Sequence, residues 1–155
     1  MNYEVTVKEM PPLHLVAIRR DTTPDTIGKD LTESWGELSE YLGSHSLAPQ
    51  DVPICVYRSW EPNNWVIETC FAVGGEVQPQ GDVHPLEIPG GRSASLIHEG
   101  PYEELGLANR AMERWFNDNG YEMTDLPYER YITDPTIEMD PAKYQTEVVW
   151  PLKDG

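Results

Sequence analysis

A glutamate within an apolar strand pattern is the side chain of this sequence best suited to chemistry. Residues 127–133 have β-strand character, and side chains alternate between the two faces of a strand, so Glu129 and Tyr131 share one face. A carboxylate on an apolar face is costly to ionise without a partner, and burial raises its pKa. Glu129 is therefore a candidate buried acid. A purely structural role, as the partner of Arg92 or Arg110, remains the alternative.

Aromatic side chains supply the rest of the candidate site. Tyr57 and Tyr131 occupy corresponding strand positions, and Trp35 and Trp115 lie in the apolar stripes of two predicted helices. Aromatic faces attract cations and flat molecules, whereas the same residues also pack in ordinary cores. Glu68 lies in the middle of a predicted strand and is a candidate second acid, with a solvent-facing position as the alternative.

Motifs for metal binding or catalysis are scarce. The four histidines, His14, His45, His84 and His98, do not have the spacing of metal ligands. There is no phosphate loop, dinucleotide fingerprint or nucleophile elbow. The sequence therefore predicts no metal and no cofactor. Cys55 and Cys70 fall in predicted strands and are expected to be small core residues.

Two helices of matching length position these residues. Apolar residues spaced by three or four predict one helix within residues 24–43 and a second within residues 101–120. The first segment opens at Pro24 and closes at Gly43, and the second opens at Pro101 and closes at Gly120. Both segments have the same length. The equal lengths indicate that the chain contains a repeat.

Pairs of β-rich runs flank both helices. The runs are residues 4–10, 13–20, 53–58 and 65–73 around the first helix, and 86–88, 92–98, 127–133 and 144–150 around the second. Each half therefore has a hairpin–helix–hairpin pattern. We predict an α+β fold of two pseudo-symmetric modules, with a mostly antiparallel sheet and both helices packed on one face. A single domain spans residues 1–155, with repeat halves at about 1–75 and 84–153.

The repeat explains why Glu129 stands out. Aligning the halves places Glu129 on Cys55, Tyr131 on Tyr57, and Glu147 on Glu68. Cysteine is among the most frequently buried residue types. A glutamate at the corresponding position is therefore expected to be buried as well.

The charge of the chain excludes some classes of partner. Its 27 acidic and 11 basic residues give a formal net charge of −16, which argues against direct nucleic-acid binding and against an anionic membrane surface. No apolar run reaches 18 residues, and the first residues lack a basic and apolar leader. We expect a cytoplasmic protein whose partner is a small hydrophobic or cationic ligand.

Four stretches of the sequence stand out by their order and spacing: the opening residues 3–20, residues 90–105 (GGRSASLIHEGPYEEL), residues 127–135 (PYERYITDP) and residues 146–152 (TEVVWPL). Together they resemble the GyrI-like small-molecule-binding domain, the superfamily of effector-binding domains in multidrug-responsive transcription regulators. The resemblance implies an aromatic-lined ligand cleft between the two modules with one acid at its base. By motif match, that acid is Glu129.

The resemblance implies three functions. The first, which we favour, is a non-enzymatic, stand-alone binding protein for hydrophobic, cationic, drug-like compounds that acts as a sensor or sequestering module beside a separate DNA-binding regulator. The second is a small hydrolase of cyclopropane-containing DNA-alkylating compounds, in which Glu129 is the catalytic acid or base. The third is an inhibitor that binds DNA gyrase, with an acidic surface that mimics DNA.

Overall fold

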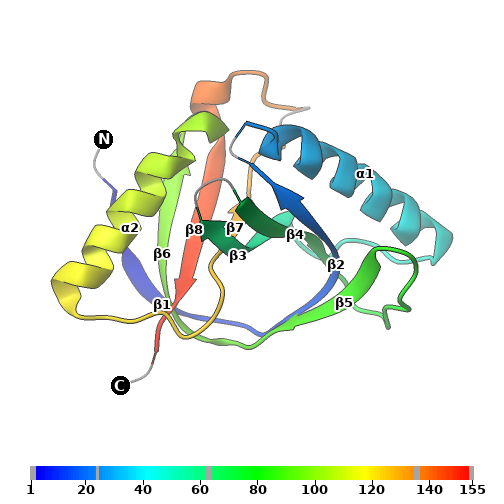
Figure 1. Ribbon diagram of the computed structural model, residues 1–155, viewed down its shortest axis with the longest axis horizontal. Helices are drawn as coiled ribbons and strands as arrows, with labels where there is room; N and C mark the ends of the chain where they lie inside the picture. The colour runs from blue at the N-terminus through cyan, green and yellow to red at the C-terminus, as the bar shows by residue number, and fades with distance from the viewer. Residues whose placement is uncertain (1–2, 24, 62–63, 135–136, 154–155) are drawn as a thin grey trace. The chain divides into compact units, whose positions relative to one another are not determined.

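The computed structural model describes residues 3–23, 25–61, 64–134 and 137–153 and confirms the predicted α+β class (Figure 1). The described residues form eight strands, two α-helices and two short 3-10 helices. They divide into two compact units, residues 12–89 on the one hand and residues 1–11 with 90–155 on the other. No helix in the described part of the chain is long and apolar enough to cross a membrane.

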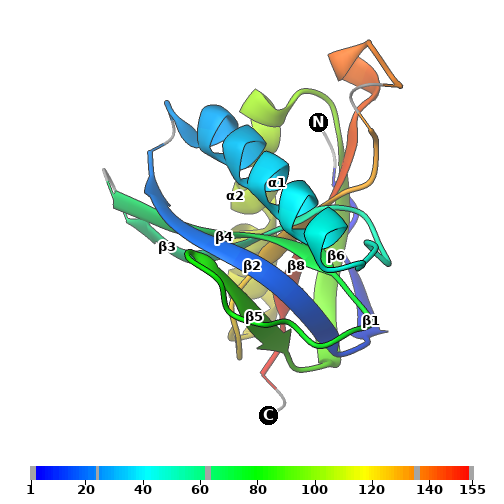
Figure 2. The ribbon, with the colours of Figure 1, turned by 90° about the vertical axis from the view of Figure 1, so that its right-hand side faces the viewer.

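The unit of residues 12–89 is a four-stranded antiparallel sheet with one helix. The sheet order is β5 (Val83–Ile88), β2 (Leu13–Thr22), β4 (Asn64–Ala72) and β3 (Ile54–Glu61). Helix α1 (Ile27–Ser44) packs against β2 and β4 and runs alongside β2 (Figure 2). Its apolar stripe buries Leu38, Tyr41 and Leu42 in the core of this unit.

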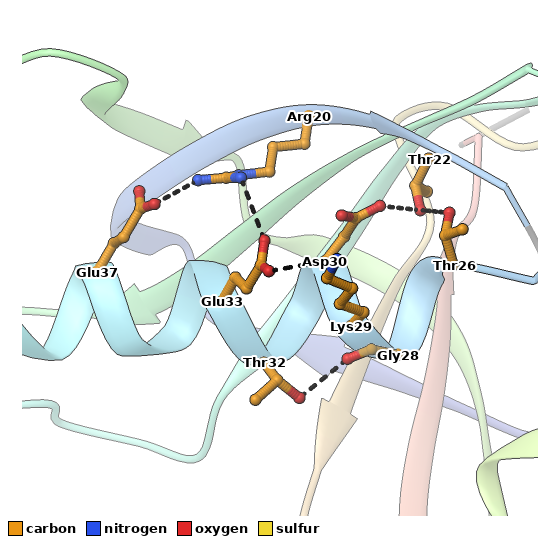
Figure 3. Close-up of polar contacts among 9 residues, drawn as sticks. All are labelled: Arg20, Thr22, Thr26, Gly28, Lys29, Asp30, Thr32, Glu33 and Glu37. Atoms are coloured by element: carbon orange, nitrogen blue, oxygen red, sulfur yellow. Dashed lines mark hydrogen bonds and ion pairs between the residues drawn. The ribbon is translucent and has the colours of Figure 1, made fainter.

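Polar contacts also attach α1 to β2 (Figure 3). Thr22 Oγ1 donates to Asp30 Oδ2 at 2.6 Å, and Arg20 Nη2 donates to Glu37 Oε1 at 2.7 Å. The predicted opening proline, Pro24, lies outside the described residues. Gly43 does not end the helix, which continues to Ser44, because one glycine in a helix costs only about 1 kcal/mol and the buried stripe outweighs it.

The other unit has the same architecture. Its antiparallel sheet has the order β1 (Thr6–Met10), β6 (Gly91–Glu99), β8 (Gln145–Pro151) and β7 (Tyr128–Tyr131). Helix α2 (Leu105–Asn119) packs against β6 and β8 and follows the 3-10 helix η1 (Tyr102–Glu104); a second 3-10 helix, η2 (Pro141–Lys143), precedes β8. As predicted, Gly120 ends α2, in a left-handed conformation with φ 69°.

The strand pairing differs from the prediction in one respect. Residues 4–10 and 13–20 were expected to form a hairpin, but β1 pairs with β6 whereas β2 pairs with β4 and β5. The junction is Pro11-Pro12, and two-residue hairpin turns need a positive φ that proline cannot adopt. The two runs before the second helix also do not pair with each other, since β5 pairs with β2 whereas β6 pairs with β1 and β8. Each unit therefore takes an edge strand from the other half of the sequence, and the strand orders remain equivalent.

Candidate functional site

Glu129 is buried on the face of its sheet that packs against α2. Its side chain is 2% exposed. Tyr131 Oη donates to Glu129 Oε1 at 2.8 Å, and Asn109 Nδ2 of α2 donates to Glu129 Oε2 at 3.3 Å. Hydrogen bonds to a carboxylate offset part of its desolvation. Tyr131 of the same strand and Asn109 of α2 thus hold both oxygens of the acid in a defined orientation.

Three tyrosine rings form a chain of contacts that starts at Tyr131, the hydrogen-bond partner of this acid. The Tyr102 ring of η1 lies edge-on to Tyr131, with centroids 5.6 Å apart, and its centroid lies 5.2 Å from that of Tyr144. Tyr131 is buried, whereas Tyr102 and Tyr144 are half-buried. Burial, assisted by the neighbouring Tyr144 and Asp134, raises the pKa of Tyr102, so its hydroxyl stays neutral at physiological pH. The cluster offers aromatic surface close to a carboxylate.

The strand register supports the predicted alignment of the two halves. Glu129 pairs with Val148 and Tyr131 with Thr146, while Cys55 pairs with Thr69 and Tyr57 with Ile67. Cys55 is completely buried. Glu129 is therefore a buried acid at a position where the other unit has a small apolar side chain.

Asn109 was not predicted, and the reason lies in the helix alignment. The buried residues Ser34, Leu38 and Leu42 of α1 correspond to Ala108, Met112 and Phe116 of α2. With this correspondence Asn109 occupies the place of Trp35, whereas the alignment on proline and glycine puts Trp35 on Met112. The burial pattern of the two stripes was the signal that could have identified Asn109.

The remaining predicted aromatic residues are in different surroundings. Trp35 is half-buried against the core cluster of the unit of residues 12–89. In the same unit, Tyr57 makes an edge-on contact with Trp65, with centroids 6.2 Å apart. Trp115 stacks on Tyr121 near the end of α2, with centroids 5.1 Å apart. Of the predicted set, the structure brings Tyr131 into direct contact with Glu129, and a ligand-binding role of the other aromatics stays a prediction.

Glu68 is part of a buried ion cluster. It is 1% exposed, so the solvent-facing alternative is wrong. Arg58 Nε donates to its Oε2 at 2.7 Å, and His84 Nε2 lies 2.6 Å from its Oε1. Arg58 comes from β3, which pairs with β4, and His84 comes from β5, which is separated from β4 by β2. Glu68 thus links three parts of its own sheet.

Glu147 makes the corresponding cluster in the other unit. It is 1% exposed and contacts Lys8 Nζ at 2.6 Å, Arg130 Nη1 at 2.5 Å and Ser95 Oγ at 2.5 Å. Burial acts to raise the pKa of Glu147, but the hydrogen bonds from Lys8, Ser95 and Arg130 outweigh it and lower the pKa overall. Since Glu147 alternates with Val148 along β8, it lies on the opposite face from Glu129.

Similar solved structures include the C-terminal domain of EcmrR. That domain is 25% identical, with a TM-score of 0.80 over 100% of both chains. An EcmrR chain in an EcmrR–DNA complex is also 25% identical, with a TM-score of 0.87. The match covers 99% of this chain but 58% of that one, so this chain spans a little over half of that EcmrR chain.

More distant structures share the fold alone. SAV2435, solved with bound tetraphenylphosphonium, is 11% identical with a TM-score of 0.67, covering 97% of this chain and 94% of that one. A hydrolase from Listeria innocua is 13% identical with a TM-score of 0.67, covering 97% and 92%. No curated protein matches the chain. The family model of the GyrI-like small molecule binding domain matches residues 3–153.

Proposed function

The chain belongs to the family of GyrI-like small molecule binding domains, and we propose that it binds hydrophobic organic cations through Glu129 and the neighbouring tyrosines. One observation carries this proposal. The buried carboxylate of Glu129 is held by the hydroxyl of Tyr131 and the amide of Asn109, beside the rings of Tyr102 and Tyr144. Such a site is suited to a sensor or a sequestering module for drug-like compounds.

The chemistry of these groups favours cations over anions. Burial strengthens the attraction between a carboxylate and a positive ligand, because less water screens it. The negative faces of aromatic rings attract the same positive charge. A site made of several aromatic rings and one carboxylate selects weakly for the shape of the ligand, so flat or bulky hydrophobic cations of several kinds would bind.

The likeness to EcmrR suggests the setting in which such a module acts. EcmrR occurs in a complex with DNA, whereas the net charge of −16 makes this chain itself unsuited to contact phosphates. We therefore propose that the DNA contacts of such a system are made outside residues 1–155, by a DNA-binding regulator in the cytoplasm. Binding to DNA gyrase is the less favoured partnership, because it rests on the family resemblance and on the acidic charge alone.

Titration with tetraphenylphosphonium tests the proposal. The binding constant is measured by calorimetry for the wild type and for Glu129→Gln, which keeps the shape of the side chain and removes its charge. At an effective dielectric constant of about 20, opposite charges about 6 Å apart attract by about 3 kcal/mol, and desolvation offsets part of this, so we expect binding to weaken by about 10- to 100-fold.

Two further variants control this experiment. Glu113→Gln removes one negative charge from an exposed position of α2, and it should leave the binding constant nearly unchanged. Tyr131→Phe keeps the ring but removes the hydroxyl that orients Glu129, and it should weaken binding several-fold. Wild-type protein that does not bind the cation, or Glu129→Gln protein that binds it equally well, would overturn the proposal.

A hydrolase would use the same acid and is the second candidate. The contact of 2.8 Å between Tyr131 Oη and Glu129 Oε1 is within the range for proton transfer, and a Listeria innocua hydrolase shares the fold. Incubation with a cyclopropane-containing alkylating compound distinguishes the two functions. Repeated addition of water to the compound, abolished in Glu129→Gln, identifies a hydrolase, whereas stoichiometric binding of intact compound identifies a binding module.

A further inference from the structure

The sheet face that carries Glu129 also carries a buried hydroxyl group with no hydrogen bond. Thr146 of β8 is 0% exposed, and its Oγ1 has no hydrogen-bond partner among the described residues. A buried polar group left unsatisfied costs about 1–3 kcal/mol. Valine has almost the same shape without this cost, so the presence of threonine needs an explanation.

Thr146 lies next to the candidate site. It pairs with Tyr131 of β7 on one side and with His98 of β6 on the other. Directly opposite side chains in an antiparallel sheet have Cβ atoms about 4.5–5.5 Å apart, and diagonal neighbours lie about 7–8 Å apart. Since Glu129 pairs with Val148, Glu129 is the diagonal neighbour of Thr146 on the same face.

The neighbouring histidine is already engaged. His98 is completely buried, its Nδ1 lies 2.8 Å from Tyr3 Oη, and its Nε2 lies 3.1 Å from the carbonyl oxygen of Pro101. A carbonyl can only accept, so Nε2 donates to Pro101, while Nδ1 lies within hydrogen-bond distance of the Tyr3 hydroxyl. Both ring nitrogens of His98 therefore have partners. The hydroxyl of Thr146, opposite His98 in the sheet, has none among the described residues.

The equivalent positions of the other unit show that the fold does not require these polar groups. The strand register places Ile67 where Thr146 stands and Cys55 where Glu129 stands. Both Ile67 and Cys55 are completely buried. The same backbone thus accepts apolar side chains at both positions, and the acid and the hydroxyl occur together in one unit.

We propose that the hydroxyl of Thr146 is a second polar contact of the ligand site, an inference that rests on the proposed function. Glu129 then binds the positive centre of the ligand. Thr146 forms a hydrogen bond with a polar group that lies one aromatic ring away from that centre. The ligand class is accordingly an organic cation that carries a hydroxyl or amino group on an aromatic ring. Since Thr146 is buried, such a ligand reaches it by displacing covering side chains.

A pair of matched probes tests this assignment. Tetraphenylphosphonium has no hydrogen-bonding group, and (4-hydroxyphenyl)triphenylphosphonium differs from it by one hydroxyl. Their binding constants are measured at a pH that keeps the phenol neutral. A neutral hydrogen bond contributes about 0.5–1.5 kcal/mol, so the wild type should prefer the hydroxylated probe by about 2- to 12-fold.

Three variants locate the origin of the preference. Thr146→Val should abolish the preference by weakening binding of the hydroxylated probe to the level of tetraphenylphosphonium, and Thr146→Ser should restore the preference. Thr69→Val makes the same change at a buried threonine of the other unit whose Oγ1 is also without a partner among the described residues. This control should keep the preference.

The outcomes separate the two proposals. Wild-type protein that binds neither probe contradicts the proposed function and this inference together. Wild-type protein that binds tetraphenylphosphonium without preferring the hydroxylated probe contradicts the inference alone. A preference that persists in Thr146→Val also overturns the inference, because the hydroxyl of the probe then has another partner.

Discussion

Replacing Glu147 with glutamine tests whether a buried charge holds β1 on its sheet. The carboxylate accepts hydrogen bonds from Lys8 of β1, Arg130 of β7 and Ser95 of β6. Glutamine keeps one acceptor oxygen but loses the charge. Hydrogen bonds to a charged group contribute about 1.5–3 kcal/mol each, and neutral ones about 0.5–1.5 kcal/mol.

The expected loss is smaller than the sum of these contacts. The side chain of Lys8 is 45% exposed and that of Arg130 is 22% exposed, so both cations regain water when the charge disappears. We therefore expect Glu147→Gln to lower the free energy of unfolding by about 2 kcal/mol at pH 7. Lys8→Met, which removes the more exposed partner, should cost less.

The effect should depend on pH. The hydrogen bonds hold the pKa of Glu147 in the folded state below its usual value. The charge therefore contributes stability above about pH 4.3, the ordinary pKa of glutamate, and this contribution is lost as the pH falls through the lower folded pKa. The stability difference between wild type and Glu147→Gln should narrow toward acid.

Urea unfolding followed by circular dichroism, from pH 7 to pH 3, measures this difference. The other acidic residues titrate in both proteins, so their contributions largely cancel when the two curves are subtracted. A difference that stays constant from pH 7 to pH 3 would refute the reasoning, because the lost stability would then come from packing rather than from charge.

Other contacts give predictions of the same kind. The hydrogen bond to Glu87, followed by that to the carbonyl of Gly75, raises the pKa of His14, so its stabilisation is present below about pH 6.5 and is lost as the pH rises through the higher folded pKa. His14→Gln should therefore lower the thermal midpoint at pH 6 more than at pH 9, and an equal effect at both pH values would contradict this. Gly120→Ala should cost about 1 kcal/mol in urea unfolding because φ is 69°, whereas Gly43→Ala, inside α1 with open space around its Cβ, should stabilise by about 0.5–1 kcal/mol. Equal effects of the two alanines would contradict the assigned conformations.

The elements of the fold could be predicted because their signals are local. Alternating β-rich runs and turn residues located all the described strands; residues 65–73 were expected where β4 spans Asn64–Ala72. Two strands extend three residues beyond their predicted bounds: residues 86–88 are only half of β5, and β3 continues three residues beyond the predicted end at residue 58. The apolar stripes likewise placed both helices. The end of α1 was less certain from sequence, since Gly43 lowers helix stability only slightly and packing decides whether the helix continues.

Strand pairing could not be predicted from the same signals. Two β-rich runs separated by two residues usually form a hairpin, and only the inability of Pro11-Pro12 to adopt a positive φ argued against it. Which sheet receives each strand then depends on contacts between residues far apart in the chain, such as Lys8 with Glu147.

The candidate site was predictable in part for a related reason. Glu129 stands out because the corresponding residue is Cys55, a comparison that needs only the repeat. Asn109 could not be identified before the burial pattern aligned the two helices. Tyr102 and Tyr144 are far from Tyr131 in sequence and meet it only in the folded unit.

The exchanged edge strands determine the order in which the chain can fold as it is synthesised. The unit of residues 12–89 is continuous in sequence, so the ribosome supplies all of its strands once β5 has emerged. By contrast, β1 has no sheet to join until β6 is complete, and that sheet lacks its inner strand until β8, at Gln145–Pro151, is released. Strand β1 thus waits for strands that are synthesised much later. The unit that contains Glu129 and Thr146 forms only after β8 has been translated.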